Sequence, residues 1–116
     1  MLQNQITLKN LQMVGEEINH ELGAKMVKDF QDENPTEITS NYIGRNILER
    51  ILAQPDCQGI RFYNAINEIG KKTLVYVGVD KNENIITKSI GVNKAGELIE
   101  APGIVADRSD ITTLDW

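Results

Sequence analysis

The sequence predicts an α+β fold in which two amphipathic helices pack on a small antiparallel sheet of three to four strands. Apolar residues recur at helical spacing between residues 19 and 53, and at strand spacing between Gly59 and Asp80. Polar turn sequences separate the strand-like segments that follow. With 116 residues, the chain has the size of a single domain spanning residues 1–116.

The first segment, residues 1–14, leaves two interpretations open. The spacing of Ile6, Leu8, Leu11 and Val14 favours a helix, whereas Ile6, Thr7 and Leu8 would also suit a short strand. Gly15 then marks a break, because glycine is unfavourable inside a helix.

The first helix is expected from Asn19 to about Glu33. Its apolar side chains share one face: Ile18, Leu22, Met26, Val27 and Phe30. The side chain of Asn19 is suited to capping the first turn, and Pro35 disfavours helical geometry at Asn34.

The second helix is expected from about Asn41 to Ala53, with Thr39 or Ser40 as its N-cap. Its apolar stripe comprises Ile43, Ile47, Leu48, Ile51 and Leu52. Pro55 ends this helix.

The segment from Gly59 to Asp80 predicts two strands joined by a turn near Gly70. The second strand is apolar on both faces between Leu74 and Val79, which is typical of an interior strand covered on both sides. We expect a third strand within residues 85–92 and a short fourth strand within residues 97–100. The tail beyond Pro102 has the composition of a loop.

Composition and charge narrow the classes of partner. The net charge is −5, and the largest basic cluster is the pair Lys71 and Lys72, so we expect neither nucleic acid nor a membrane as partner. The apolar runs are too short to span a bilayer, residues 1–20 do not resemble a signal peptide, and there is one cysteine, so the expected location is cytoplasmic.

Two loop motifs fail when their full patterns are compared. Asp80, Asn82 and Asn84 match the start of a calcium loop, but Ile85 and Gly91 occupy the positions that need Gly and Glu. Residues 91–96 have the glycine spacing of a phosphate loop without the Lys and Ser/Thr that must follow. Both segments are therefore interpreted as turns between strands.

The single histidine, His20, and the single cysteine, Cys57, are candidates for catalysis only if other groups join them. His20 is expected to be exposed near an acidic helix start, and Cys57 has no base nearby in the sequence. No catalytic residue, metal ligand or cofactor is predicted, and an enzyme is the less favoured class.

One group of side chains predicts a binding surface. Arg61, Tyr63 and Tyr76, accompanied by Asn64 and Asn67, could line one face of the sheet, combining apolar area with polar tips. Arg61 could pair with an anionic group. The competing interpretation is a polar face covered by solvent or by a helix.

Residues 54–84 resemble a family of small uncharacterised bacterial proteins. The shared pattern comprises Cys57, then Gly59 to Tyr63 (GIRFY), then Leu74, Val75 and Val77 to Asp80. Some relatives end in a Cys-Pro-rich tail, which this sequence lacks. The resemblance supports the two strands and implies no activity.

Three function classes follow from these observations. The favoured one is a non-enzymatic interaction or regulatory module that presents a sheet surface to a protein partner or to its own copy as a homodimer. The alternative is a small-ligand protein that binds an anionic metabolite through Arg61, Tyr63 and Tyr76. A small enzyme relying on Cys57 or His20 ranks third.

Overall fold

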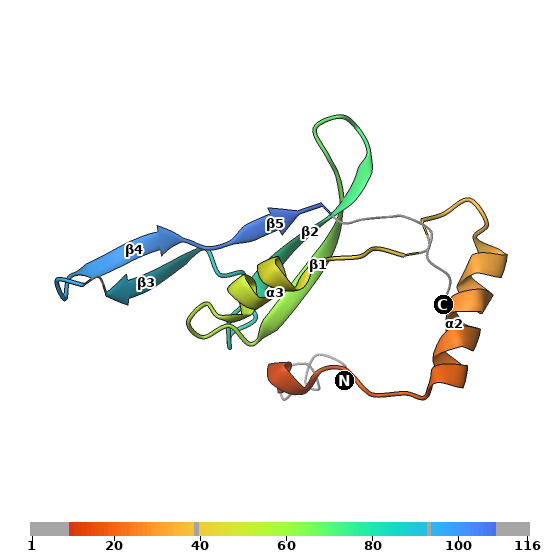
Figure 1. The fold of residues 1–116 in the computed structure, drawn as a ribbon, viewed down its shortest axis with the longest axis horizontal. Coiled ribbons are helices and arrows are strands. Elements are labelled where there is room, and N and C mark those ends of the chain that lie inside the picture. The colour runs from red at the N-terminus through yellow and green to blue at the C-terminus, as the bar shows by residue number, and fades with distance from the viewer. Residues whose placement is uncertain (1–9, 39, 93, 109–116) are drawn as a thin grey trace. The chain divides into compact units, whose positions relative to one another are not determined.

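The computed structural model describes residues 10–38, 40–92 and 94–108 (Figure 1). Among these residues the chain divides into two compact units, one built from residues 10–14 and 44–108 and the other from residues 15–43. The combination of two helices with a three-stranded antiparallel sheet confirms an α+β fold. The prediction of a single domain stays a prediction.

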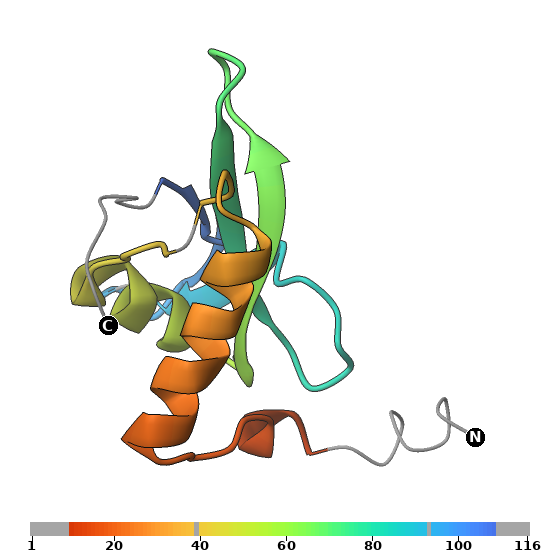
Figure 2. The same cartoon turned by 90° about the vertical axis from the view of Figure 1, so that its right-hand side faces the viewer.

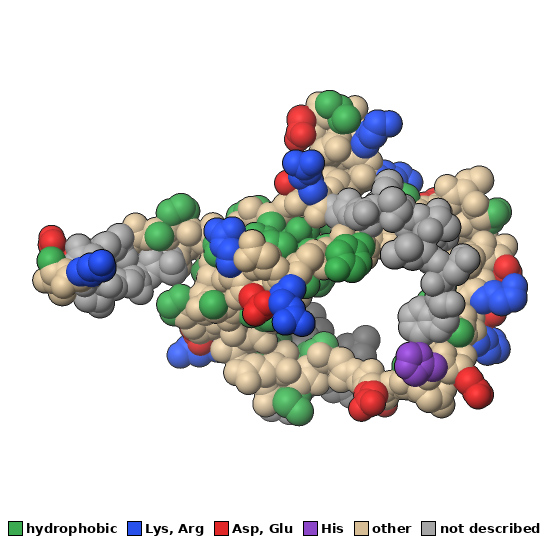
Figure 3. Space-filling model, viewed as in Figure 1, with side chains coloured by type: hydrophobic (Ala, Val, Ile, Leu, Met, Phe, Trp, Pro, Cys, Tyr) green, Lys and Arg blue, Asp and Glu red, His purple; other side chains and the backbone are tan. Residues whose placement is uncertain are grey.

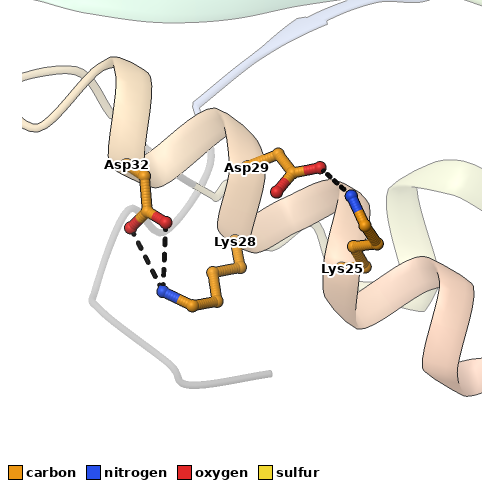
Figure 4. A network of polar contacts seen from close by, with 4 residues as sticks. All are labelled: Lys25, Lys28, Asp29 and Asp32. Carbon is orange, nitrogen blue, oxygen red and sulfur yellow. Dashed lines mark hydrogen bonds and ion pairs between the residues drawn. The ribbon is translucent and has the colours of Figure 1, made fainter.

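The unit of residues 15–43 contains helix α2 (His20–Glu33), as the apolar spacing predicted. The side chain of Asn19 caps it by accepting a hydrogen bond from the backbone N–H of Leu22 at 2.8 Å. Two ion pairs at i, i+4 spacing, Lys25–Asp29 and Lys28–Asp32, follow its polar side (Figure 4). These pairs are exposed, so they contribute little to stability.

Helix α3 (Arg45–Leu52) is shorter than predicted. Its N-cap is Gly44, whose backbone is extended, and not Ser40, while Thr39 lies outside the described residues. The helix ends at Leu52, shortly before Gln54, whose helical geometry Pro55 disfavours. Ile51 on α3 is fully buried, and α3 contacts strands β1 and β2.

The central hairpin is confirmed. Strand β1 (Gly59–Ile66) pairs antiparallel with β2 (Lys72–Val79), and Figure 2 shows them as a long twisted pair joined by a turn. Strand β5 (Val105–Asp107) pairs with the other side of β2. Strand β2 is therefore the middle strand, as its two apolar faces predicted. Among the residues whose burial is described, the buried apolar side chains are Ile51, Tyr76, Val77, Val79 and Ile86.

The expected third and fourth strands form but do not join this sheet. Strands β3 (Lys88–Val92) and β4 (Leu98–Pro102) make a separate two-stranded sheet (Figure 1). The third strand of the main sheet is β5, which lies in the tail whose composition predicts a loop. The prediction was wrong because the pairing edge of β2 is occupied by a strand from farther along the chain.

Candidate functional site

The register of the hairpin separates the three predicted site residues. Arg61 and Tyr63 lie opposite Val77 and Val75, so they share one face of the sheet. Tyr76 lies opposite Phe62, which places its side chain on the other face. Asn64 is also on the face of Tyr76, and Asn67 lies in the turn. The predicted set therefore does not form one surface, and only Arg61 and Tyr63 are brought together.

Tyr76 is a core residue. Its side chain is 2% exposed, its ring lies 5.5 Å from that of Phe62, and its hydroxyl donates to the backbone carbonyl of Arg108 at 3.0 Å. Burial, together with the nearby carboxylate of Asp107, raises the pKa of Tyr76. This side chain fixes β5 to β2 and is not available to a ligand.

The outer edge of β1 is the clearest feature that could receive a partner. Among the described residues, β2 is the only strand beside β1. The N–H of Asn67 donates to the carbonyl of Lys71 at 2.8 Å, which identifies these residues as a hydrogen-bonded pair. Because such pairs alternate in an antiparallel ladder, the backbone groups of Ile60, Phe62 and Asn64 point away from β2.

The edge of β2 that points away from β1 follows the same alternation. The carbonyl of Gly78, which lies opposite Ile60, points away from β1 and accepts a hydrogen bond from the N–H of Ile86 at 3.0 Å. The outward carbonyl of Gly78 is thus used within the protein, and Tyr76 on the same edge pairs with Ala106 of β5. The corresponding groups on the outer edge of β1 have no strand beside them in the described part of the chain.

A groove of about 340 Å³ runs beside the first half of β1. One wall is the short 3-10 helix η1 (Leu11–Met13) with the residue after it, and the other is the start of β1 together with Val79 of β2. The lining is mostly apolar and includes Leu11, Val14, Gln58, Ile60, Arg61 and Phe62. A hydrogen bond of 2.8 Å from Gln12 Nε2 to Gln58 Oε1 joins the two walls.

Sequence reasoning missed Leu11, Val14 and Gln58 as parts of this groove. The apolar spacing of residues 1–14 suits either a helix or a strand. Residues 1–9 lie outside the described residues, and η1 is a single 3-10 turn. The contact between Gln12 and Gln58 joins positions 46 residues apart. No local pattern in the sequence encodes such a contact.

Among the residues that the structure describes, Arg61 is the one charged side chain that lines this groove. Its Nη2 lies 3.8 Å from Glu83 Oε1, and both side chains are partly exposed, at 41% and 33%. A pair of this length and exposure is weak. Arg61 could therefore turn from Glu83 to an anionic group in the groove at little cost.

The exposed side chains of β1 are largely apolar. Phe62 is 48% exposed, Tyr63 39% and Ile66 65%. Figure 3 shows apolar atoms among charged ones over the turn between β1 and β2. The strand therefore combines outward-pointing backbone groups with exposed apolar side chains.

Cys57 and His20 are the remaining candidates from the sequence. The Sγ of Cys57 donates to the carbonyl of Gly59 at 3.3 Å, and His20 is the exposed first residue of α2. Within the described ranges, no group of three or more His, Cys, Asp or Glu side chains could hold a metal ion. None of the helices in those ranges is long and apolar enough to cross a membrane.

The first rejected loop motif is a turn, as predicted, and so are residues 94–96 of the second motif, whose residue 93 lies outside the described residues. Asp80 Oδ1 accepts hydrogen bonds from the N–H groups of Asn82 and Asn84 at 2.9 and 3.0 Å. This carboxylate therefore satisfies its own backbone. Residues 94–96 connect β3 to β4, and Gly96 has a φ of 81°.

Comparisons with known proteins identify no relative. Neither a scan with protein-family models, nor a search of curated proteins, nor a search of solved structures finds a match to this chain. The resemblance over residues 54–84 stays a prediction.

Proposed function

We propose that this protein is a non-enzymatic interaction module that binds an extended protein segment along the outer edge of β1. The observation that carries the proposal is the row of outward-pointing backbone groups at Ile60, Phe62 and Asn64 beside an apolar groove. An added strand would pair with these groups, and pockets beside the strand would select its side chains. The proposed setting is the cytoplasm, supported by the single cysteine of the chain.

A selection from a displayed library of short linear peptides tests this function. The purified protein should enrich peptides with alternating apolar residues, because alternate side chains of an added strand face the same side. Substitution Asn64→Pro removes one outward N–H, and proline is tolerated at such edge positions. The variant should bind the selected peptides at least about tenfold more weakly.

Asn64→Ala is the matched control, because it removes the side chain and keeps the backbone N–H. It should bind the peptides as the wild type does. Failure to enrich any peptide when the protein is immobilised sparsely enough to keep its copies apart, or equal binding by the proline and alanine variants, would contradict strand addition at β1.

A second candidate function is the binding of a small anionic ligand, which the position of Arg61 in an apolar groove supports. The ligand would place its apolar part between η1 and β1 and its anionic group on the guanidinium. Tyr63 shares the face of Arg61, whereas the buried Tyr76 would take no part.

Thermal denaturation with added amphipathic carboxylates such as octanoate tests the second candidate. Binding to the folded protein should raise Tm in proportion to ligand concentration, and Arg61→Gln should abolish the rise. An equal rise for Arg61→Gln would show that the guanidinium does not hold the anion. Acetate controls for general salt effects.

A further inference from the structure

The sequence of strand β1 has few of the residues that normally protect the edge of a sheet. It contains no proline and no acidic residue, and its only charged side chain is Arg61. Edge strands are usually shortened, charged or interrupted, because an unprotected edge is a template for another strand. With the bounds Gly59–Ile66, β1 is long for an edge strand and carries exposed Phe62 and Ile66.

Strand β1 of a second copy has the features that a strand pairing with this edge would need. Its end carries Ile66, which is 65% exposed, and its beginning borders the apolar groove lined by Leu11 and Val14. In an antiparallel pair of identical strands, the end of one lies beside the beginning of the other. Each Ile66 would then enter the groove of the opposite copy, so both exposed apolar surfaces would be covered at once.

The alternation of hydrogen bonds restricts the register. Only Ile60, Phe62, Asn64 and Ile66 offer outward backbone groups, so even-numbered residues must pair with even-numbered residues. The two longest symmetric ladders pair residues 59–65 around Phe62, or residues 60–66 around Tyr63. In these ladders Ile66 of the second copy lies opposite Gln58 or Ile60, both of which line the groove.

Charge disfavours the neighbouring register. A ladder centred on Arg61 would place two guanidinium groups directly opposite each other, and like charges in that position are destabilising. In the ladder around Phe62, Arg61 instead lies opposite Tyr63 of the second copy, where the cation can contact the ring. The self-complementary ladders are therefore those that leave Arg61 away from the symmetry axis.

We propose that a second copy of this chain is the segment that β1 receives. The two β1 strands pair antiparallel about a two-fold axis and join two three-stranded sheets into one sheet of six. The inference rests on the proposed function, since it names the partner of the same edge. It assigns Ile66 to the groove beside η1 of the opposite copy.

The mass in solution, measured by light scattering during gel filtration, is the first test. The wild type should rise from 13.0 kDa towards twice that mass as its concentration increases through the micromolar range. Asn64→Pro should weaken dimerisation at least about tenfold, and Asn64→Ala should not. Circular dichroism should show that both variants keep the secondary structure of the wild type.

Disulfide trapping in the full chain is the second test, and it does not depend on the folding of the proline variant. In a Cys57→Ala background, Phe62→Cys or Tyr63→Cys should oxidise to a covalent dimer. Residues facing each other across the axis lie about 4.5 to 5.5 Å apart between Cα atoms, which suits a disulfide. Asn82→Cys, in the exposed turn after β2, is the control and should not cross-link.

The mass and cross-linking measurements together decide whether a second copy binds β1. A mass of 13.0 kDa at high micromolar concentration would overturn it. So would a dimer that Asn64→Pro leaves intact and that neither cysteine traps. If the chain is monomeric and still selects peptides that require the N–H of Asn64, the proposed function stands and only the second copy is excluded as partner.

Discussion

Tyr76 shows how one residue can look like a binding group in the sequence and serve the core in the structure. Its ring lies beside that of Phe62 on one face of the sheet, and its hydroxyl donates to the carbonyl of Arg108. Deprotonation would place a negative charge in a buried position near Asp107. The folded state therefore favours the neutral phenol, which is why its pKa is raised.

Because the pKa of Tyr76 is raised in the folded state, the protein should lose stability at alkaline pH. The contribution of Tyr76 is complete below the ordinary tyrosine pKa of about 10 and declines as the pH rises through the higher folded-state value. Urea denaturation of the wild type should therefore show a loss of stability above about pH 10. Tyr76→Phe should be about 1 kcal/mol less stable at neutral pH and should lose less on alkalinisation.

Tyr42→Phe is the control for this dependence, because Tyr42 is 63% exposed. Its stability should follow that of the wild type at every pH. An identical alkaline loss for wild type and Tyr76→Phe would show that another group causes it.

At the scale of elements, the position of β5 depends on a close crossing of two backbone segments. A Cβ built on Gly103 would lie 1.9 Å from the carbonyl oxygen of Ile86, so a side chain does not fit. The N–H of Gly103 donates to the carbonyl of Thr87 at 2.8 Å. Next to it, the N–H of Ile104 donates to the Oε1 of the buried Gln54 at 2.9 Å. These contacts lead the chain from β4 back to the edge of β2.

Gly103→Ala should therefore destabilise the protein by about 3 kcal/mol, because the backbone must shift to remove the overlap. Urea denaturation followed by circular dichroism measures this difference. Gly59→Ala is the matched control: its Cβ would meet nothing within 4 Å, so we expect a change within about 0.5 kcal/mol. Equal stability of the two variants would show that the crossing relaxes without cost.

The parts of the fold that depend on local sequence patterns could be predicted from the sequence. The helix α2 with its Asn19 cap, the β1–β2 hairpin and the interior position of β2 follow from apolar periodicity, capping and turn residues. These features involve residues close together in the chain. The burial of β2 on both faces was visible because every side chain from Leu74 to Val79 is apolar, aromatic or glycine.

The parts that the sequence did not predict depend on distant contacts. The pairing of β5 with β2 requires the crossing at Gly103 and the hydrogen bond between Gln54 and Ile104, which are 50 residues apart. The groove requires η1 to lie beside β1. The face on which Tyr76 lies depends on the strand register, because a shift of one residue would reverse it.

The short length of β5 limits how far any assembly can extend. A sheet that grows by edge pairing continues as long as each new copy presents another open edge. Pairing through β1 leaves β5 (Val105–Asp107) at both ends of the combined sheet, and this strand offers few backbone groups for a further copy. The unprotected edge of β1 would be consumed in a closed pair, so that growth of this sheet stops at two copies and does not continue into a fibre.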